Sequence, residues 1–107
     1  MPVIKIFCPQ APAPAQAQQL GQTLHALCRE LMHAQPDAIQ VLLVPGTLML
    51  GGQPLLVEAH YRDRPDRQGA VLTQFLQALD AAVQQAFGQA PRIRSFAIDQ
   101  ATLGAVR

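Results

Sequence analysis

Pro2 is the residue of this sequence whose position best suits acid–base chemistry. Removal of Met1 would make it the terminal residue, with a ring-locked secondary amine at the start of the apolar segment Val3–Phe7. An ordinary α-amino group titrates at about 7.7–8.0, and burial lowers that pKa because desolvation disfavours the charged form. A buried terminal proline would therefore be neutral near pH 7 and suited to act as a general base.

A second interpretation gives Pro2 no chemical role. Proline is small enough to permit removal of the initiator methionine, and most chains that begin Met-Pro do no chemistry there. If Met1 stays, the nitrogen of Pro2 belongs to an amide and cannot act as this base. The chain would then fold without having this acid–base chemistry.

Three arginines are the other candidates for a site. Arg62 and Arg64 lie in the segment 62–67, where positive and negative residues alternate, a pattern typical of a solvated helix entry. Arg94 lies in an apolar segment, where a charge needs a partner or an open pocket. A guanidinium binds a carboxylate through two parallel hydrogen bonds and stabilises an enolate-like oxygen.

The histidines do not form a metal site in the sequence. Glu58 and His60 share one strand face but lie about 7 Å apart along the strand, so an inter-subunit or channel-lining role is expected for them. His25 and His33 lack neighbours at ligand spacing and are expected at the surface. No metal and no cofactor are predicted.

Length and composition limit the class of protein. The 107 residues are 50% hydrophobic and 14% charged, which predicts one domain over residues 1–107. A net charge of +1 without a basic stripe argues against a nucleic-acid partner, and the lack of a long apolar run argues against a membrane. Cys8 and Cys28 have no ligand or redox spacing and are expected to be reduced packing residues in a cytoplasmic protein.

The chain reads as two copies of one unit, at about 2–45 and 54–100. Leucines at helical spacing recur at a constant offset of 52 residues, which is also the offset between Pro2 and Pro54. Each copy reads as strand, helix, strand. The expected elements are Val3–Cys8, Ala15–Ala34 and Ile39–Val44, followed by Leu55–Arg62, Asp66–Phe87 and Ile93–Ile98.

This order predicts an α+β (α/β) fold, a tandem β-α-β repeat. Right-handed crossovers would give a four-stranded sheet with both helices packed on one face. Asp66 is expected to cap the second helix and Gly88 to end it, while Pro45–Gln53 is expected to form a short turn or hairpin. The uncovered sheet face stays largely apolar, which predicts a homo-oligomer.

A doubled β-α-β of this length, opening with Met1-Pro2 and an apolar strand, resembles the tautomerase superfamily over essentially the whole chain. The stretch Val41–Gly52 looks like the corresponding segment of the macrophage migration inhibitory factor branch, through Val44-Pro45, Leu48-Met49 and Gly51-Gly52. Carboxymethyl-hydroxymuconate isomerases are similar in size. The resemblance implies a homotrimer in which the terminal proline moves a proton between carbon and oxygen of an enol or keto acid.

The resemblance also implies roles for arginines. Short-chain relatives have one arginine after the first strand and one on the second strand, both serving substrate carboxylate or carbonyl groups. The first copy departs from this pattern, with Pro12 and Gln40 at those positions, whereas the second copy matches it with Arg64 and Arg94. Pro2 would supply the base, and Arg64 and Arg94, with Arg62, would bind the anion from the same or a neighbouring subunit.

These features predict a cofactor-free tautomerase acting on a small carboxylate-bearing enol or keto acid. Two alternatives stay open. The same site would also suit a hydratase, dehalogenase or decarboxylase, since such chemistries occur in the superfamily. The fold would also suit a non-catalytic trimeric interaction module, because half of the arginine pattern is missing.

Overall fold

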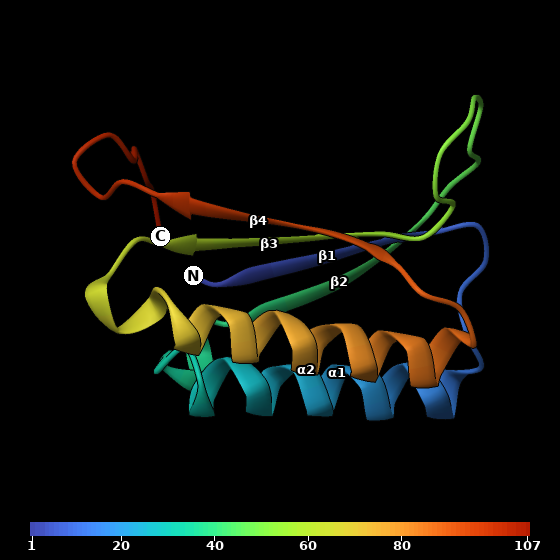
Figure 1. The fold of residues 1–107 in the computed structure, drawn as a ribbon, viewed down its shortest axis with the longest axis horizontal. Coiled ribbons are helices and arrows are strands. Elements are labelled where there is room, and N and C mark those ends of the chain that lie inside the picture. The colour runs from blue at the N-terminus through green and yellow to red at the C-terminus, as the bar shows by residue number, and fades with distance from the viewer.

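The computed structural model describes residues 1–107 as one four-stranded sheet and two long helices (Figure 1). The first half of the chain contains β1 (Val3–Cys8), α1 (Pro14–Glu30), the short 3-10 helix η1 (Pro36–Ala38) and β2 (Gln40–Pro45). The second half contains β3 (Leu56–Arg62), the 3-10 helix η2 (Pro65–Arg67), α2 (Ala70–Phe87) and β4 (Arg92–Ile98). The predicted order of two β-α-β units is confirmed.

The sheet has the strand order β2-β1-β3-β4. The strands of each unit pair in parallel, β1 with β2 and β3 with β4, while β1 pairs with β3 in antiparallel fashion. Both helices lie side by side on one face of the sheet (Figure 1), as predicted. Neither helix is both long enough and apolar enough to cross a membrane.

The core lies between this sheet face and the helices. Alternate residues of β1 and β3 are buried, which is the period of a strand covered on one side. The fully buried side chains on this face include Ile4 and Ile6 of β1, Leu55 just before β3, and Val57 and Ala59 of β3. Tyr61 of β3 lies on the same face and is also buried.

The constant offset of 52 residues is wrong in detail. The buried stripe of α1 is Leu20, Leu24 and Cys28, and that of α2 is Phe75, Leu79 and Val83. Phe75 follows Leu20 by 55 positions, whereas β3 begins 53 positions after β1 and β4 begins 52 after β2. The offset changes because the second strand-to-helix connection is longer than the first and the second helix-to-strand connection is shorter.

The start of the second helix also differs from the prediction. Asp66 belongs to η2, and α2 begins only at Ala70, after Gly69 with a positive φ of 62° and without a side-chain cap. Asp66 cannot cap α2 because its carboxylate is bonded to the side chain of Arg64. Gly88 ends α2 in the left-handed conformation, as predicted.

The segment between the two units forms a loop and not a hairpin. Residues 46–55 contain no strand and project from one end of the sheet (Figure 1). The chain reverses at Gly51 and Gly52, which both have a positive φ. Met49 and Leu50 are 94% and 90% exposed, so these two apolar side chains of the loop cover nothing within the chain.

The other face of the sheet is uncovered in the single chain. Its large exposed apolar residues include Leu42, Val44 and Phe96. Glu58 and His60 share this face, and the Glu58 side chain reaches along the strand, so that its Oε1 lies 3.1 Å from His60 Nε2. The His60 ring also stacks on Phe96 with a centroid distance of 4.7 Å.

Two glycine substitutions should change the stability in opposite directions. Gly88→Ala forces a side chain into a left-handed conformation and should cost about 1 kcal/mol in the free energy of unfolding. Gly21→Ala lies inside α1, where a methyl group meets nothing within 4 Å, and should add about 0.5–1 kcal/mol. Urea unfolding measures both changes in stability, provided that the slope of the free energy against urea concentration is unchanged. A stabilised Gly88→Ala would contradict the assigned helix end.

The buried thiol of Cys28 should make the stability fall at alkaline pH. Burial raises the pKa of Cys28 from 9.0 to about 12. Above pH 9 the unfolded chain therefore releases a proton that the folded chain retains, and the free energy of unfolding falls by up to about 1.4 kcal/mol per pH unit until pH 12. The stability difference between the wild type and Cys28→Ala should shrink between pH 9 and pH 12. A constant difference would contradict the raised pKa of Cys28.

Candidate active site

The candidate site lies where the start of β1 meets the ends of β3 and β4. The N-terminus, the end of α1 and the C-terminal ends of β3 and β4 all lie at one end of the molecule, opposite the loop of residues 46–55 (Figure 1). The antiparallel pairing of β1 with β3 causes this, because it puts Val3 opposite His60. Continuing the register brings Pro2 level with Tyr61 and Met1 level with Arg62.

A cavity of about 300 Å³ opens at this end. Three arginines and the N-terminal residue line it, and no carboxylate does. The lining residues are Met1, His33, Gln35, Ala38, Arg62, Arg64, Arg67 and Gln100. The cavity is therefore positively charged and suited to an anion.

Pro2 is buried directly behind Met1. Its ring is among the fully buried side chains, and its carbonyl accepts a hydrogen bond of 3.1 Å from the backbone N–H of Gln40. Met1 is bonded to the Pro2 nitrogen and itself lines the cavity. Removal of Met1 would consequently leave the Pro2 nitrogen facing this cavity.

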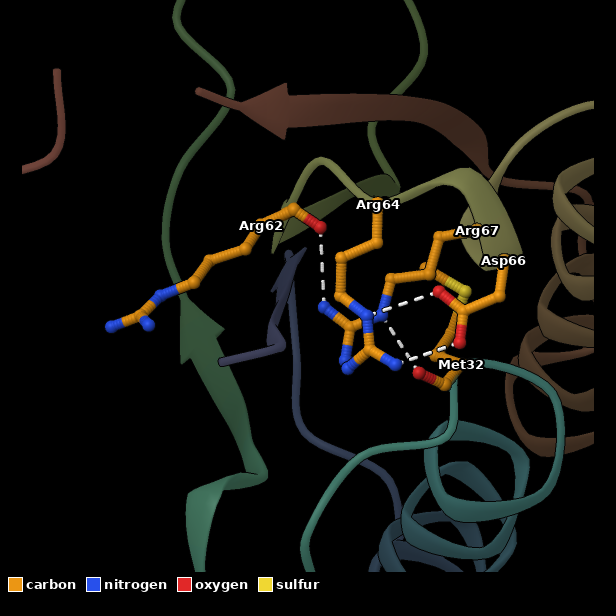
Figure 2. Close-up of polar contacts among 5 residues, drawn as sticks. All are labelled: Met32, Arg62, Arg64, Asp66 and Arg67. Carbon is orange, nitrogen blue, oxygen red and sulfur yellow. Dashed lines mark hydrogen bonds and ion pairs between the residues drawn. The ribbon is translucent and has the colours of Figure 1, made fainter. Parts of the chain in front are cut away.

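Arg64 is held by an acidic neighbour. Its Nε and a terminal nitrogen donate to the two carboxylate oxygens of Asp66 at 3.0 and 2.7 Å (Figure 2). Burial alone would raise the pKa of Asp66, but the hydrogen bonds and charge of Arg64 outweigh it and lower that pKa. Both side chains are more than 40% exposed, so solvent screens this ion pair and it contributes little to stability.

Arg62 and Arg67 differ from Arg64 because neither forms an ion pair. The Arg62 side chain points away from the other two arginines (Figure 2), and its Nε is buried without a hydrogen-bond partner. Arg67 is only 3% exposed and donates to two backbone carbonyls, Met32 at 2.7 Å and Arg62 at 3.2 Å (Figure 2). Two of the three guanidinium charges thus remain without a counter-charge.

The electrostatic environment favours a neutral amine at the N-terminus. Burial, followed by the charges of Arg62 and Arg67, lowers the pKa of the Met1 amine below 8.0. The Cys28 thiol lies close enough to contribute a small opposing effect on this pKa. An amine in this position is therefore more often unprotonated at neutral pH than one in water.

The structure brings together three of the four residues singled out from the sequence. Arg62 and Arg64 line the cavity and Pro2 is bonded to Met1, which also lines it, whereas Arg94 is not among the lining residues. Arg94 pairs with Glu58 in the sheet register and points from the open face, four residues before Ile98, which lies opposite Arg62. The separation along β4 is about 13 Å, so Arg94 does not reach the cavity of its own chain.

Sequence reasoning missed Arg67 and placed His33 only at the surface. The alternating charges of residues 62–67 suggested solvated side chains, and nothing in that pattern distinguishes the buried arginine from its exposed neighbours. His33 is exposed as expected, but it also lines the cavity. The structure contains no group of three His, Cys, Asp or Glu side chains arranged to hold a metal ion.

Comparison with known proteins finds solved structures of the same fold. No family model and no curated protein matches the sequence. A fused 4-OT that forms an asymmetric trimer has a TM-score of 0.81 at 17% identity, over 96% of this chain and 91% of that chain. A macrophage migration inhibitory factor-like protein from Entamoeba histolytica has a TM-score of 0.76 at 9% identity, over 98% and 95% of the two chains.

A third similar structure is that of Pt0534 inactivated by 2-oxo-3-pentynoate, with a TM-score of 0.76 at 17% identity, over 96% of this chain and 90% of that chain. At such identities the likeness is one of fold, and all three structures are of tautomerase superfamily members. The strand order, the two helices on one face and the doubled β-α-β unit are therefore those of the tautomerase superfamily fold.

Proposed function

We propose that the protein is a cofactor-free tautomerase that uses Pro2, once Met1 is removed, as a general base on a small enol or keto acid. The observation that carries this proposal is the position of Pro2 beside a cavity lined by three arginines and no carboxylate. A base next to a carboxylate-binding pocket is what abstraction of a proton α to a carbonyl requires.

The proposed reaction moves one proton and leaves no net change in atoms. The neutral Pro2 amine takes a proton from the oxygen or carbon of the substrate, and the resulting ammonium returns it to the other atom. Negative charge develops on the substrate oxygen between these steps, and a guanidinium stabilises it. An amide nitrogen has no free electron pair for this purpose, so the activity depends on removal of Met1.

The arginines of the cavity would bind the substrate in two ways. Arg62 lines the cavity without an ion-pair partner, so a carboxylate would meet an uncompensated positive charge there. Arg64 uses its Nε and one terminal nitrogen to bind Asp66, so a substrate carboxylate would bind the remaining donors of the guanidinium or displace that side chain. Because the Arg64–Asp66 pair is exposed and weak, this displacement costs little.

Arg94 would serve the site of a neighbouring subunit in a homotrimer. Its own cavity is about 13 Å away along the strand, whereas the open face on which it lies is uncovered. The similar fused 4-OT forms a trimer. A trimer of this chain would cover Leu42, Val44 and Phe96 and bring Arg94 to another copy, and light scattering would measure the assembly.

The non-catalytic alternative would hold if Met1 were retained, because the Pro2 nitrogen would then belong to an amide. Intact mass of the untagged protein decides whether Met1 is removed. Assays with halogenated acrylates and malonate semialdehyde would separate hydratase, dehalogenase and decarboxylase activity from tautomerase activity.

Pro2→Ala should lower kcat/KM for a phenylpyruvate-type enol by at least about 100-fold, the usual contribution of a positioned general base. The wild type and the variant are compared after mass spectrometry has shown that both lack Met1.

Pt0534 is inactivated by 2-oxo-3-pentynoate. The same acetylenic keto acid should add to the free Pro2 amine here, forming a nitrogen–carbon bond as the amine proton moves to the alkyne carbon. Unchanged turnover by Pro2→Ala would overturn the mechanism.

Mixing inactive variants tests the trimeric site. If Pro2 and Arg94 of one site come from different chains, co-refolding Pro2→Ala with Arg94→Gln should restore up to about a quarter of the wild-type activity, since subunits combine at random. The matched control is Pro2→Ala mixed with Arg64→Gln, which should restore none, because Arg64 lines the cavity of the same chain to which Pro2 lies adjacent through Met1. Recovery in neither mixture would contradict the neighbouring-subunit role of Arg94.

A further inference from the structure

Arg67 is the one charged side chain among the buried residues of the molecule. It has no carboxylate within ion-pair distance, since the only pairs of that kind are Glu58 with His60 and Arg64 with Asp66. Burying a charge without a counter-charge costs several kcal/mol unless hydrogen bonds replace the lost water. A residue kept in this state calls for a specific explanation.

The hydrogen bonds of Arg67 join two segments that frame the cavity. Its Nε donates to the carbonyl of Met32, just beyond the end of α1, and a terminal nitrogen donates to the carbonyl of Arg62, the last residue of β3. Carbonyls at the C-terminal end of a helix lack partners within the helix and carry partial negative charge. The guanidinium therefore binds where the backbone itself provides acceptors.

The charge of Arg67 acts on the cavity because no acid neutralises it. The groups that face the N-terminus are Arg62 from β3, Arg67 from η2, His33 beyond α1 and the Cys28 thiol of α1. The charge of Arg64 is matched by Asp66, so it contributes little beyond that pair. Arg67 lowers the pKa of the terminal amine together with burial and Arg62.

We propose that Arg67 is a positioning residue for the Pro2 base: it ties the end of α1 to the end of β3 around the cavity, and it places an unneutralised positive charge beside the amine. This inference rests on the proposed function of Pro2 as a general base. Arg67 touches no reacting atom in this scheme and acts through the amine and through the backbone of Arg62.

The test separates the charge of Arg67 from its hydrogen bonds. Arg67→Met and Arg67→Gln remove the charge, whereas Arg67→Lys keeps the charge but loses the planar, forked guanidinium. The matched control is Arg92→Met, which removes the charge of an exposed arginine at the start of β4. Each protein is prepared without Met1 and labelled with nitrogen-15 proline. The pKa of the Pro2 amine is then read by NMR titration, which requires no activity, and kcat/KM is measured against pH.

The two neutral variants should raise the amine pKa by about half a unit to one unit, which lowers kcat/KM by about 3- to 10-fold on the acidic side and little on the alkaline side. Arg67→Lys should keep the low amine pKa but lose kcat through the displaced Arg62 backbone. Arg92→Met should match the wild type in both measurements.

An unchanged amine pKa in a folded neutral variant would overturn the electrostatic role, and a wild-type kcat in Arg67→Lys would overturn the positioning role. If neither neutral variant folds, the Lys variant still decides, since loss of its low amine pKa contradicts the proposal. An inactive wild type whose amine pKa responds to Arg67 would reject the tautomerase function and keep the electrostatic result.

Discussion

The antiparallel pairing of β1 with β3 is the contact on which the rest of the structure depends. It joins the two β-α-β units into one sheet, and all other strand pairs lie within a unit. In an antiparallel pair the start of one strand lies beside the end of the other. For this geometric reason the N-terminus from the first unit meets the arginine-rich turn after β3 from the second.

The same pairing explains how one site takes its parts from two copies of a repeated unit. The first unit supplies Pro2 and has no arginine after its strand, whereas the second unit supplies Arg62, Arg64 and Arg67 and has no free terminus. Neither unit contains a complete site. A parallel junction would have put the two sets of residues at opposite ends of the sheet.

The sequence predicts the elements well where a single face decides burial. Val3–Cys8 was predicted with its observed bounds, and the expected strand Leu55–Arg62 differs from β3 by a single residue, because strands with one covered side show period two. The register of the second unit was predicted less well, since the loop lengths that shift it carry no periodic signal. The start of α2 was misplaced because Asp66 is a good cap by type but is already bonded to Arg64.

The candidate site was likewise predicted only in part. Pro2 was singled out because its proposed chemistry depends on its place in the chain, Arg62 because it ends a strand, and Arg64 because it follows that strand. Arg67 was missed because its burial results from the turn of η2, which directs one of three closely spaced arginines inward. Spacing alone gives no means to choose among side chains of the same type in an irregular segment.

The two hydrogen bonds between Arg64 and Asp66 have a consequence for the kind of anion that the cavity would select. A carboxylate that takes the place of Asp66 on this edge of the Arg64 guanidinium exchanges one ion pair for another, so the number of ion pairs stays the same. Salt screens the internal pair and the new pair alike, so ionic strength would change this exchange little. Asp66 thus acts as an internal competitor of the same chemical type, and at this edge a ligand gains affinity through shape and not through charge.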